Sequence, residues 1–266
     1  MKFYLPIILI ATVLFATNVE AIWEPAPGLT WDYLLGAEKN VIKASDKNIV
    51  TIDLIEAEEF VPYFHNRGQR VICYFSTNIY YSADYKKAKG GSNSSVDQAF
   101  EKSKEKLKSE TLIKSRMKKA MKYKCDAIEV DCFKNVEKES YEFAKWVAKT
   151  AHSIGISVGI KDVAKNSIKL EPYFDFVVVE NCADFNECYH YTCFTRHDKA
   201  VFVVHYGNRG YSLSGSSLSK LIKEQKGRNF TCVLCPNQFL NNNCVNYDCN
   251  TGAVIGKSKY TKNFLY

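Results

Sequence analysis

Eight short runs rich in Val, Ile, Phe and Tyr recur along the chain, and longer polar segments separate most of them. In order, the runs are Trp31–Gly36, Ile49–Leu54, Arg70–Ser76, Ala127–Asp131, Ser157–Asp162, Phe174–Glu180, Ala200–Tyr206 and Asn229–Cys235. Their length and their β-branched content are typical of strands that are buried on both faces. The pattern therefore predicts eight buried strands.

Several of the intervening segments have the hydrophobic period of a helix. Helices are expected over Glu56–His65, Glu101–Lys124, Ser140–Ser153 and Ser214–Lys226. The second is long enough that we expect a break in it, and serines suited to capping begin the fourth. Strands alternating with helices predict an α/β fold, a (β/α)8 TIM-type barrel with a cysteine-rich C-terminal tail. A doubly wound sheet is the alternative, but no Gly-rich phosphate loop follows the first runs.

The first 21 residues have the character of a secretory signal peptide. Lys2 gives the positive start, Leu5–Phe15 the apolar run and Val19–Ala21 a small-residue cleavage site. That apolar run is shorter than the roughly 20 residues that span a bilayer. We therefore expect a signal peptide over residues 1–21, one barrel domain over 22–266, and a secreted, extracellular protein with no membrane partner after cleavage.

Cysteine content and charge fit that location. All ten cysteines follow the predicted signal peptide, and an even number in an oxidising compartment favours disulfides, although their spacing leaves the connectivity open. Asn93 and Asn229 begin glycosylation sequons. The net charge of +7 is spread along the chain, and the lysines between Lys102 and Lys124 alternate with glutamates. We therefore expect no nucleic-acid partner, and a monomer.

Polar or ionisable side chains end six of the eight predicted strands. In strand order they are Asp53, Tyr74, Asp131, Lys161 with Asp162, Glu180, and His205 with Tyr206. Active sites of (β/α)8 barrels lie at the carboxyl ends of the strands. Solvated strand ends alone would explain one or two such residues, so the whole set predicts a polar pocket.

Asp131 and Glu180 are the two residues that suggest a reaction. Cleavage of a glycosidic bond uses two carboxyl groups, one that protonates the leaving oxygen and one that attacks the sugar carbon or activates water. We predict Asp131 and Glu180 as this catalytic pair. The predicted substrate-binding residues are Asp53, Tyr74, Lys161, Asp162, His205 and Tyr206. For Asp53, a helix N-cap or an ion pair with a lysine is almost equally well supported.

Other kinds of catalysis have less support. The five histidines show no His-Glu-x-x-His spacing, so we expect neither a metal nor another cofactor. A Ser-His-Asp arrangement is disfavoured because the sequence contains no Gly-x-Ser-x-Gly elbow.

Six motifs between Thr30 and Tyr206 occur in a defined order. They are Trp31-Asp-Tyr-Leu-Leu-Gly36, Val50-Thr-Ile-Asp53, Val71-Ile-Cys-Tyr74-Phe-Ser76, Cys125-Asp-Ala-Ile-Glu-Val-Asp131, Gly155-Ile-Ser-Val-Gly-Ile-Lys161-Asp162 and Phe174-Asp-Phe-Val-Val-Val-Glu180-Asn-Cys182. In this order and spacing they resemble glycoside hydrolase family 114, the endo-α-1,4-polygalactosaminidase family. The resemblance implies a barrel with its catalytic acids at Asp131 and Glu180. It also implies a polysaccharide partner, an α-1,4-linked polymer of galactosamine or N-acetylgalactosamine. By analogy with retaining enzymes, Asp131 would be the nucleophile and Glu180 the acid/base.

The sequence departs from the family pattern beside the first acid. The family reads Pro-Asp-Asn-Val-Asp where this chain reads Val130-Asp131-Cys132-Phe133-Lys134, and His205 replaces a family glutamate. Two functions are therefore considered: a secreted, endo-acting hydrolase, and an inactive, carbohydrate-binding relative. The first is favoured because the carboxyl pair is present. The positive net charge favours acetylated or neutral polymers over cationic ones.

Overall fold

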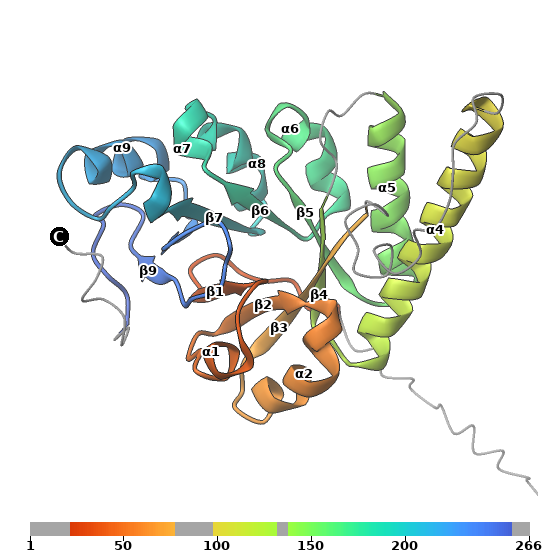
Figure 1. Ribbon diagram of the computed structural model, residues 1–266. Coiled ribbons are helices and arrows are strands. Elements are labelled where there is room, and N and C mark those ends of the chain that lie inside the picture. The colour runs from red at the N-terminus through yellow and green to blue at the C-terminus, as the bar shows by residue number, and fades with distance from the viewer. Residues whose placement is uncertain (1–21, 78–97, 132–137, 257–266) are drawn as a thin grey trace, which may run out of the picture.

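The computed structural model describes residues 22–77, 98–131 and 138–256, and contains all eight predicted strands (Figure 1). They are β1 (Trp31–Leu34), β2 (Ile49–Asp53), β3 (Arg70–Ser76), β4 (Ala127–Asp131), β5 (Ser157–Lys161), β6 (Phe176–Glu180), β7 (Ala200–Tyr206) and β8 (Thr231–Cys235). Each pairs in parallel with the next along the chain. A ninth strand, β9 (Val245–Tyr247), pairs antiparallel with β8. The predicted TIM-type barrel is confirmed as a nearly closed sheet, and β9 is an addition from the tail.

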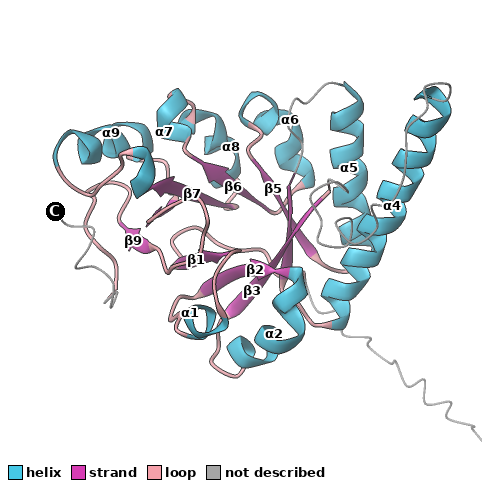
Figure 2. Cartoon of the chain, viewed as in Figure 1, coloured by secondary structure: helices cyan, strands magenta, loops and turns pink. Residues whose placement is uncertain are grey.

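Helices surround this sheet (Figure 2). The helices are α1 (Lys39–Lys43), α2 (Ala57–His65), α4 (Gln98–Lys122), α5 (Lys138–Ser153), α6 (Ser167–Leu170), α7 (Cys182–Phe185), α8 (Thr192–Thr195) and α9 (Gly215–Gln225). The four predicted helices are confirmed as α2, α4, α5 and α9. The break expected in α4 is wrong, because this helix is continuous, and Ser214 precedes α9 without a side-chain capping bond. The short helices were not predicted, because a single turn is too short to show a helical period.

The core has two layers, one on each face of the strands. Outward-facing residues of the sheet pack against the helices, while inward-facing residues fill the barrel with large rings. Trp31, Phe176 and Phe202 are fully buried there and contact one another in sequence, Trp31 with Phe202 and Phe202 with Phe176. Gly159 makes room for this filling, since a Cβ at that position would lie 2.1 Å from the Phe176 ring. The strands are therefore buried on both faces, as their composition predicts.

Four disulfides stabilise the described part of the chain, which confirms the expectation drawn from the cysteine count. They join Cys73 to Cys125, Cys182 to Cys188, Cys232 to Cys249 and Cys235 to Cys244. The last two attach the tail to β8. Cys193 has a free thiol, and Cys132 lies outside the described residues.

A side chain, not a further ladder, joins the last strand to the first. Within the described ranges, strand pairing runs from β1 to β9 and stops there. The Asn246 side chain on β9 accepts a hydrogen bond from Trp31 N (2.7 Å) and donates one to Trp31 O (2.8 Å). Nearby, the buried carboxylate of Asp32 accepts from Cys244 N (3.1 Å). An amide side chain thus takes the place of a strand neighbour for β1, and we call this junction the seam.

Replacing Asn246 with alanine is expected to lower the free energy of unfolding by about 2–4 kcal/mol. The change leaves the buried N–H and C=O groups of Trp31 without partners, and each orphaned group costs about 1–3 kcal/mol. Urea unfolding measured by tryptophan fluorescence gives this value. The matched control is Asn241→Ala at an exposed position in the same tail, for which a change within about 0.5 kcal/mol is expected. Equal losses in the two variants would contradict the closing role of Asn246.

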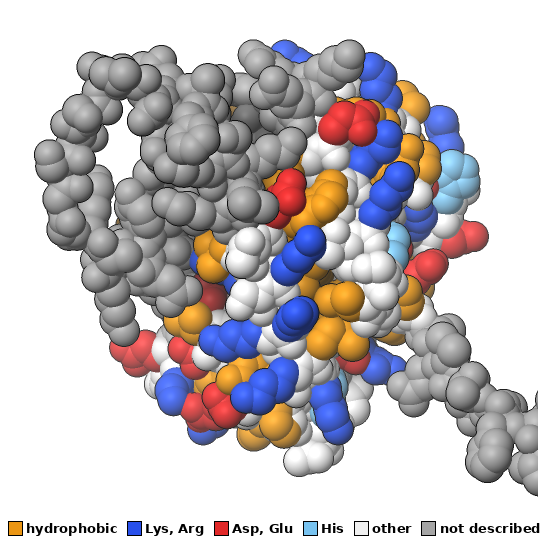
Figure 3. All heavy atoms as spheres, turned by 90° about the vertical axis from the view of Figure 1, so that its right-hand side faces the viewer, with side chains coloured by type: hydrophobic (Ala, Val, Ile, Leu, Met, Phe, Trp, Pro, Cys, Tyr) orange, Lys and Arg blue, Asp and Glu red, His pale blue; other side chains and the backbone are white. Residues whose placement is uncertain are grey.

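The outer face beside α4 carries mixed charge. In Figure 3, Lys and Arg side chains are interspersed with acidic and apolar ones and do not gather into one patch. Among the described residues, no helix combines the length and apolar character needed to cross a membrane. The predicted signal peptide lies outside the described residues and stays a prediction, as do the domain bounds.

Candidate active site

The inward face of the barrel becomes polar at the carboxyl ends of the strands. Residues two apart along a strand share a face. By this alternation the inward set consists of Tyr33, Asp53, Tyr74, Glu129, Asp131, Lys161, Glu180 and Tyr206. These residues come from seven successive strands, β1 to β7, and occupy the end of the barrel where TIM-barrel enzymes place their reactive groups.

Lys161 lies at the centre of this set. Its Nζ is 3.1 Å from Glu180 Oε1 and 3.5 Å from Asp131 Oδ2, so one ammonium bridges the two predicted catalytic acids. Only 11% of the lysine side chain is exposed. Burial alone would lower the pKa of Lys161, but the facing carboxylates of Glu180 and Asp131 outweigh burial and raise it above its ordinary value. The lysine is therefore a fixed positive charge over the physiological pH range.

Each of the two acids also accepts a hydrogen bond from one tyrosine. Tyr74 on β3 donates its hydroxyl hydrogen bond to Asp131 Oδ2 (3.0 Å), and Tyr206 on β7 donates to Glu180 Oε1 (2.7 Å). Each carboxylate is thus held by one tyrosine and by Lys161. The structure brings these five predicted residues into one contiguous cluster, which we call the acid–lysine cluster: Tyr74, Asp131, Lys161, Glu180 and Tyr206.

Asp162 and Asp53 border the cluster, with their carboxylates bonded to backbone. Asp162 follows β5 in the left-handed backbone region (φ 50°), and its Oδ1 accepts from Glu180 N (2.8 Å). Asn181, directly after Glu180, is also left-handed (φ 55°). After glycine, Asp and Asn are the residues that enter this backbone region most readily. Asp53 Oδ1 accepts from Ile55 N (2.9 Å) and caps a short helical turn, the alternative considered for it from the sequence.

The structure does not bring His205 to the pocket. Because Tyr206 faces inward, its neighbour His205 faces outward and packs under the helices, with none of its surface exposed. Its Nε2 accepts from Ala183 N (3.2 Å), and its ring meets Tyr211 edge-on. Burial lowers the pKa of His205 to about 3, so the imidazole is neutral and structural. The predicted grouping of His205 with Tyr206 overlooked the two-residue alternation of a strand.

The sequence interpretation missed Glu129 and Tyr33, which lie one inward position below the strand ends. The Tyr33 hydroxyl donates to Glu129 Oε1 (2.7 Å) across the barrel interior, and both residues are fully buried. Counting back two residues from Asp131 would have found Glu129. Cys132, Phe133 and Lys134, where the chain departs from the family pattern, lie outside the described residues.

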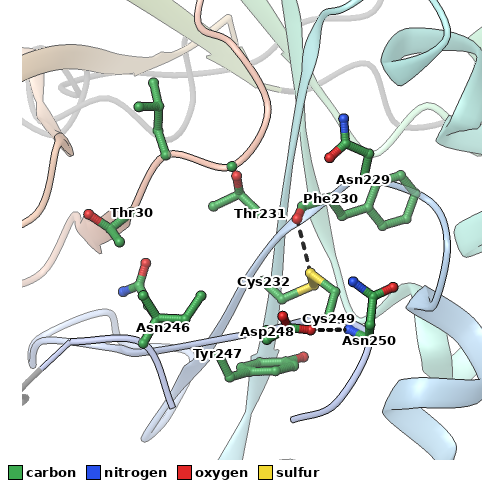
Figure 4. A pocket seen from close by; sticks show the side chains of 13 residues that line it. Thr30, Asn229, Phe230, Thr231, Cys232, Asn246, Tyr247, Asp248, Cys249 and Asn250 are labelled. Atoms are coloured by element: carbon green, nitrogen blue, oxygen red, sulfur yellow. Dashed lines mark hydrogen bonds between the residues drawn. A yellow bond between two sulfur atoms is a disulfide. The ribbon is translucent and has the colours of Figure 1, made fainter. Parts of the chain in front are cut away.

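A separate pocket of about 180 Å³ lies at the opposite end of the barrel, where β1 and β8 begin and β9 ends (Figure 4). Two of its polar side chains have structural partners, since Asn246 binds Trp31 and Asp248 Oδ1 accepts from Asn250 N (2.7 Å). The Thr231 hydroxyl is buried there without a hydrogen-bond partner among the described residues. Among the described residues, His, Cys, Asp and Glu side chains form no group of three or more suited to a metal ion. The acid–lysine cluster is therefore the candidate active site.

Comparisons with known proteins bear on the family and the fold. The family model of glycoside-hydrolase family GH114 matches residues 13–251. The crystal structure of Aspergillus fumigatus Ega3 in complex with galactosamine is similar, with a TM-score of 0.67 and 24% identity over 84% of this chain and 96% of that chain. The glycoside hydrolase domain of PelA from Pseudomonas aeruginosa gives a TM-score of 0.55 at 10% identity, over 82% of this chain and 98% of that one. No curated protein matches the chain significantly.

Proposed function

Because the chain belongs to glycoside-hydrolase family GH114 and is a glycoside hydrolase, we propose that it cleaves α-1,4-linked galactosamine polymers within the chain, using Asp131 and Glu180. The observation that carries this proposal is the shared contact of both carboxylates with the Lys161 ammonium. Two acids held around one cation face the same space. A scissile bond placed there would lie between a group that attacks and a group that protonates.

The spacing of the two acids supports a retaining mechanism. The two distances to Lys161 Nζ add up to an upper bound on the separation of the facing oxygens. In inverting enzymes the two carboxyls lie about 6.5–9.5 Å apart, and in retaining enzymes about 5–5.5 Å apart. The upper bound for Asp131 and Glu180 barely reaches the shortest separation of the inverting range. In the retaining mechanism Glu180 carries a proton when the substrate is bound. Asp131, held by Tyr74 and Lys161, attacks the anomeric carbon while Glu180 gives that proton to the leaving oxygen. Glu180 then removes a proton from the water that releases the sugar.

The local charge of the site supports a substrate with free amino groups. Although the whole chain carries +7, charges further apart than about 10 Å are largely screened at ordinary ionic strength. In the free site the charges close to the cleavage point are those of Asp131 and Glu180, set against the single ammonium of Lys161. Burial and the nearby Glu180 raise the pKa of Asp162 to about 7, so Asp162 adds negative charge only above neutral pH. A protonated galactosamine residue is favoured in such surroundings. The galactosamine found in the similar Ega3 structure supports the same sugar, against the expectation from net charge alone.

A panel of polymers tests the proposal. Galactosamine-containing polymer is incubated at several degrees of acetylation, with α-1,4-galacturonan as the anionic counterpart, and new reducing ends and product lengths are measured. We expect oligosaccharides of mixed length from the partly deacetylated polymer, and none from galacturonan. Retention of polymer without new reducing ends would favour the inactive, carbohydrate-binding alternative. Cleavage of galacturonan alone would contradict the proposed substrate.

Secretion forms part of the proposed function, because such a polymer lies outside the cell. Four disulfides among the described residues support export. Asn229 of the second sequon is exposed, on the rim of the pocket opposite the active site, where a glycan would not obstruct substrate. Expression of the full chain in a secreting eukaryotic cell should yield a mature N-terminus at Ile22 and a band that an N-glycosidase shifts. A protein retained in the cell with Met1 intact would contradict this.

A further inference from the structure

Glu129 is the most deeply buried acid of the site and has a role still to be assigned. None of its surface is exposed. Oε1 accepts the Tyr33 hydroxyl at 2.7 Å, while Oε2 is buried without a hydrogen-bond partner among the described residues. A fully buried carboxylate with an unpartnered oxygen is very costly, whereas the protonated acid has a hydroxyl in place of that charge. The geometry therefore favours the uncharged form.

We propose that Glu129 is a positioning residue that stays uncharged below the acid–lysine cluster, so that Asp131 and Glu180 alone share the charge of Lys161. The proposal rests on the function proposed above. Tyr33 provides the physical connection: its hydroxyl is bound to Glu129, and its ring centre lies 6.0 Å from Lys161 Nζ. An ionised Glu129 would draw the ammonium down toward the barrel interior and away from the two acids at the strand ends.

The groups facing Glu129 from each neighbouring element support this view. They are Tyr33 on β1, Tyr74 on β3, Asp131 on its own strand, Lys161 on β5, Glu180 on β6 and Tyr206 on β7. The pKa of Glu129 is raised to about 8, chiefly by burial. Asp131 and Glu180 contribute to the rise, while Lys161 and the Tyr33 hydroxyl act in the opposite direction. Glu129 is thus expected to be protonated over most of the neutral range and to ionise in mildly alkaline solution.

Activity at different pH values tests the role of Glu129. In the wild-type protein kcat should fall as pH rises through about 8. Glu129→Gln keeps the shape and the acceptor for Tyr33 but has no proton to lose, so its ratio of kcat at pH 9 to kcat at pH 6.5 should exceed the wild-type ratio about ten-fold. Glu129→Ala removes the acceptor and should be at least ten-fold less active than Glu129→Gln. Parallel pH profiles of wild type and Glu129→Gln would overturn the proposal, and so would equal activities of the Gln and Ala variants.

A second measurement is independent of any glycosidase activity. The native state holds the Glu129 proton up to pH 8 or so, while the unfolded chain releases it near the ordinary value of 4.5. Wild-type stability therefore loses this contribution as pH rises from 4.5 to about 8. The melting temperature of Glu129→Gln relative to wild type should rise by about 5 °C or more between pH 5 and pH 8.5. Glu142→Gln, at an exposed position, should show no such pH-dependent difference.

These readouts separate the two proposals. If no polymer is cleaved but the difference in melting temperature between Glu129→Gln and wild type rises with pH, the proposed function is wrong. The inference that Glu129 is protonated is then still supported. If Glu129→Gln does not fold, the ¹³C shift of the Glu129 carboxyl in wild-type protein gives the same answer. Titration of that signal near 4.5 would overturn the inference, whereas titration near 8 would support it.

Discussion

Replacing Asp131 with asparagine should lower kcat on the galactosamine polymer by at least ~10³-fold, because the amide keeps the shape of the side chain but is no nucleophile. Tyr74 and Lys161 still have an oxygen to bind, so we expect the fold and polymer binding to be retained. Reducing-end release under single-turnover conditions measures the loss, and binding is measured separately by isothermal titration. More than a tenth of the wild-type activity in Asp131→Asn would remove that residue from the mechanism.

The activity of Glu180→Gln on substrates with different leaving groups distinguishes the roles of the two acids. An acid catalyst matters little when the leaving group needs no proton, so an aryl oligogalactosaminide with a dinitrophenyl leaving group should still give a burst of phenolate with Glu180→Gln. The same substrate should give none with Asp131→Asn. The reverse result would exchange the two roles. Asp198→Asn is the matched control, since this exposed residue is left-handed (φ 58°) and asparagine accepts that conformation.

Replacing Lys161 with methionine is expected to reduce kcat/KM about 10²-fold and to lower the free energy of unfolding by about 2–4 kcal/mol. Two partly buried carboxylates would then face each other without the cation that holds both. The neighbouring acids raise the pKa of Lys161, so its stabilising charge is present at every pH below the ordinary lysine value and is lost only above it. Titration of Lys161 should therefore change the difference in unfolding free energy between Lys161→Met and wild type only slightly between pH 6 and pH 9.

Lys165→Met is the control for that experiment, because Lys165 lies in the short helical turn that follows β5 and is exposed. We expect its activity and melting temperature to match the wild type. Denaturant unfolding and initial rates on the same preparations give both quantities. A Lys161→Met protein as stable and as active as Lys165→Met would show that the bridging contact contributes nothing.

Much of the fold could be predicted from the sequence because burial on both faces leaves a strong local signal. Strands such as β6 consist almost wholly of Phe and Val, and a charged residue at the end of such a run has few places to go except the barrel mouth. Asp131 and Glu180 were predicted on this ground, and the structure brings them together around Lys161. Their catalytic roles are for the variants above to test.

The residues that were missed or misplaced depend on two things: the face of the strand to which a side chain points, and contacts between residues far apart along the chain. His205 and Glu129 were misjudged for one reason: position relative to a strand end was considered, while the alternation of faces was not. One is turned out under the helices and the other is turned into the core. Asn246 could not have been found this way, because its partner Trp31 is 215 residues distant along the chain. No local pattern encodes a contact of that separation.

The seam gives the barrel a place where exchange with solvent should begin. Side-chain hydrogen bonds and a few tail contacts hold β1 there, whereas β3 to β6 lie between full ladders on either side. Amide protons of β1 should therefore exchange with deuterium sooner than those of β4 or β5, through partial opening that leaves the rest of the barrel folded. Tyr33 belongs to β1, so the Tyr33–Glu129 hydrogen bond would be lost in that opening while Lys161 and its two acids still hold together. Transient opening at the seam would thus affect Asp131 and Glu180 first through a change in the protonation of Glu129.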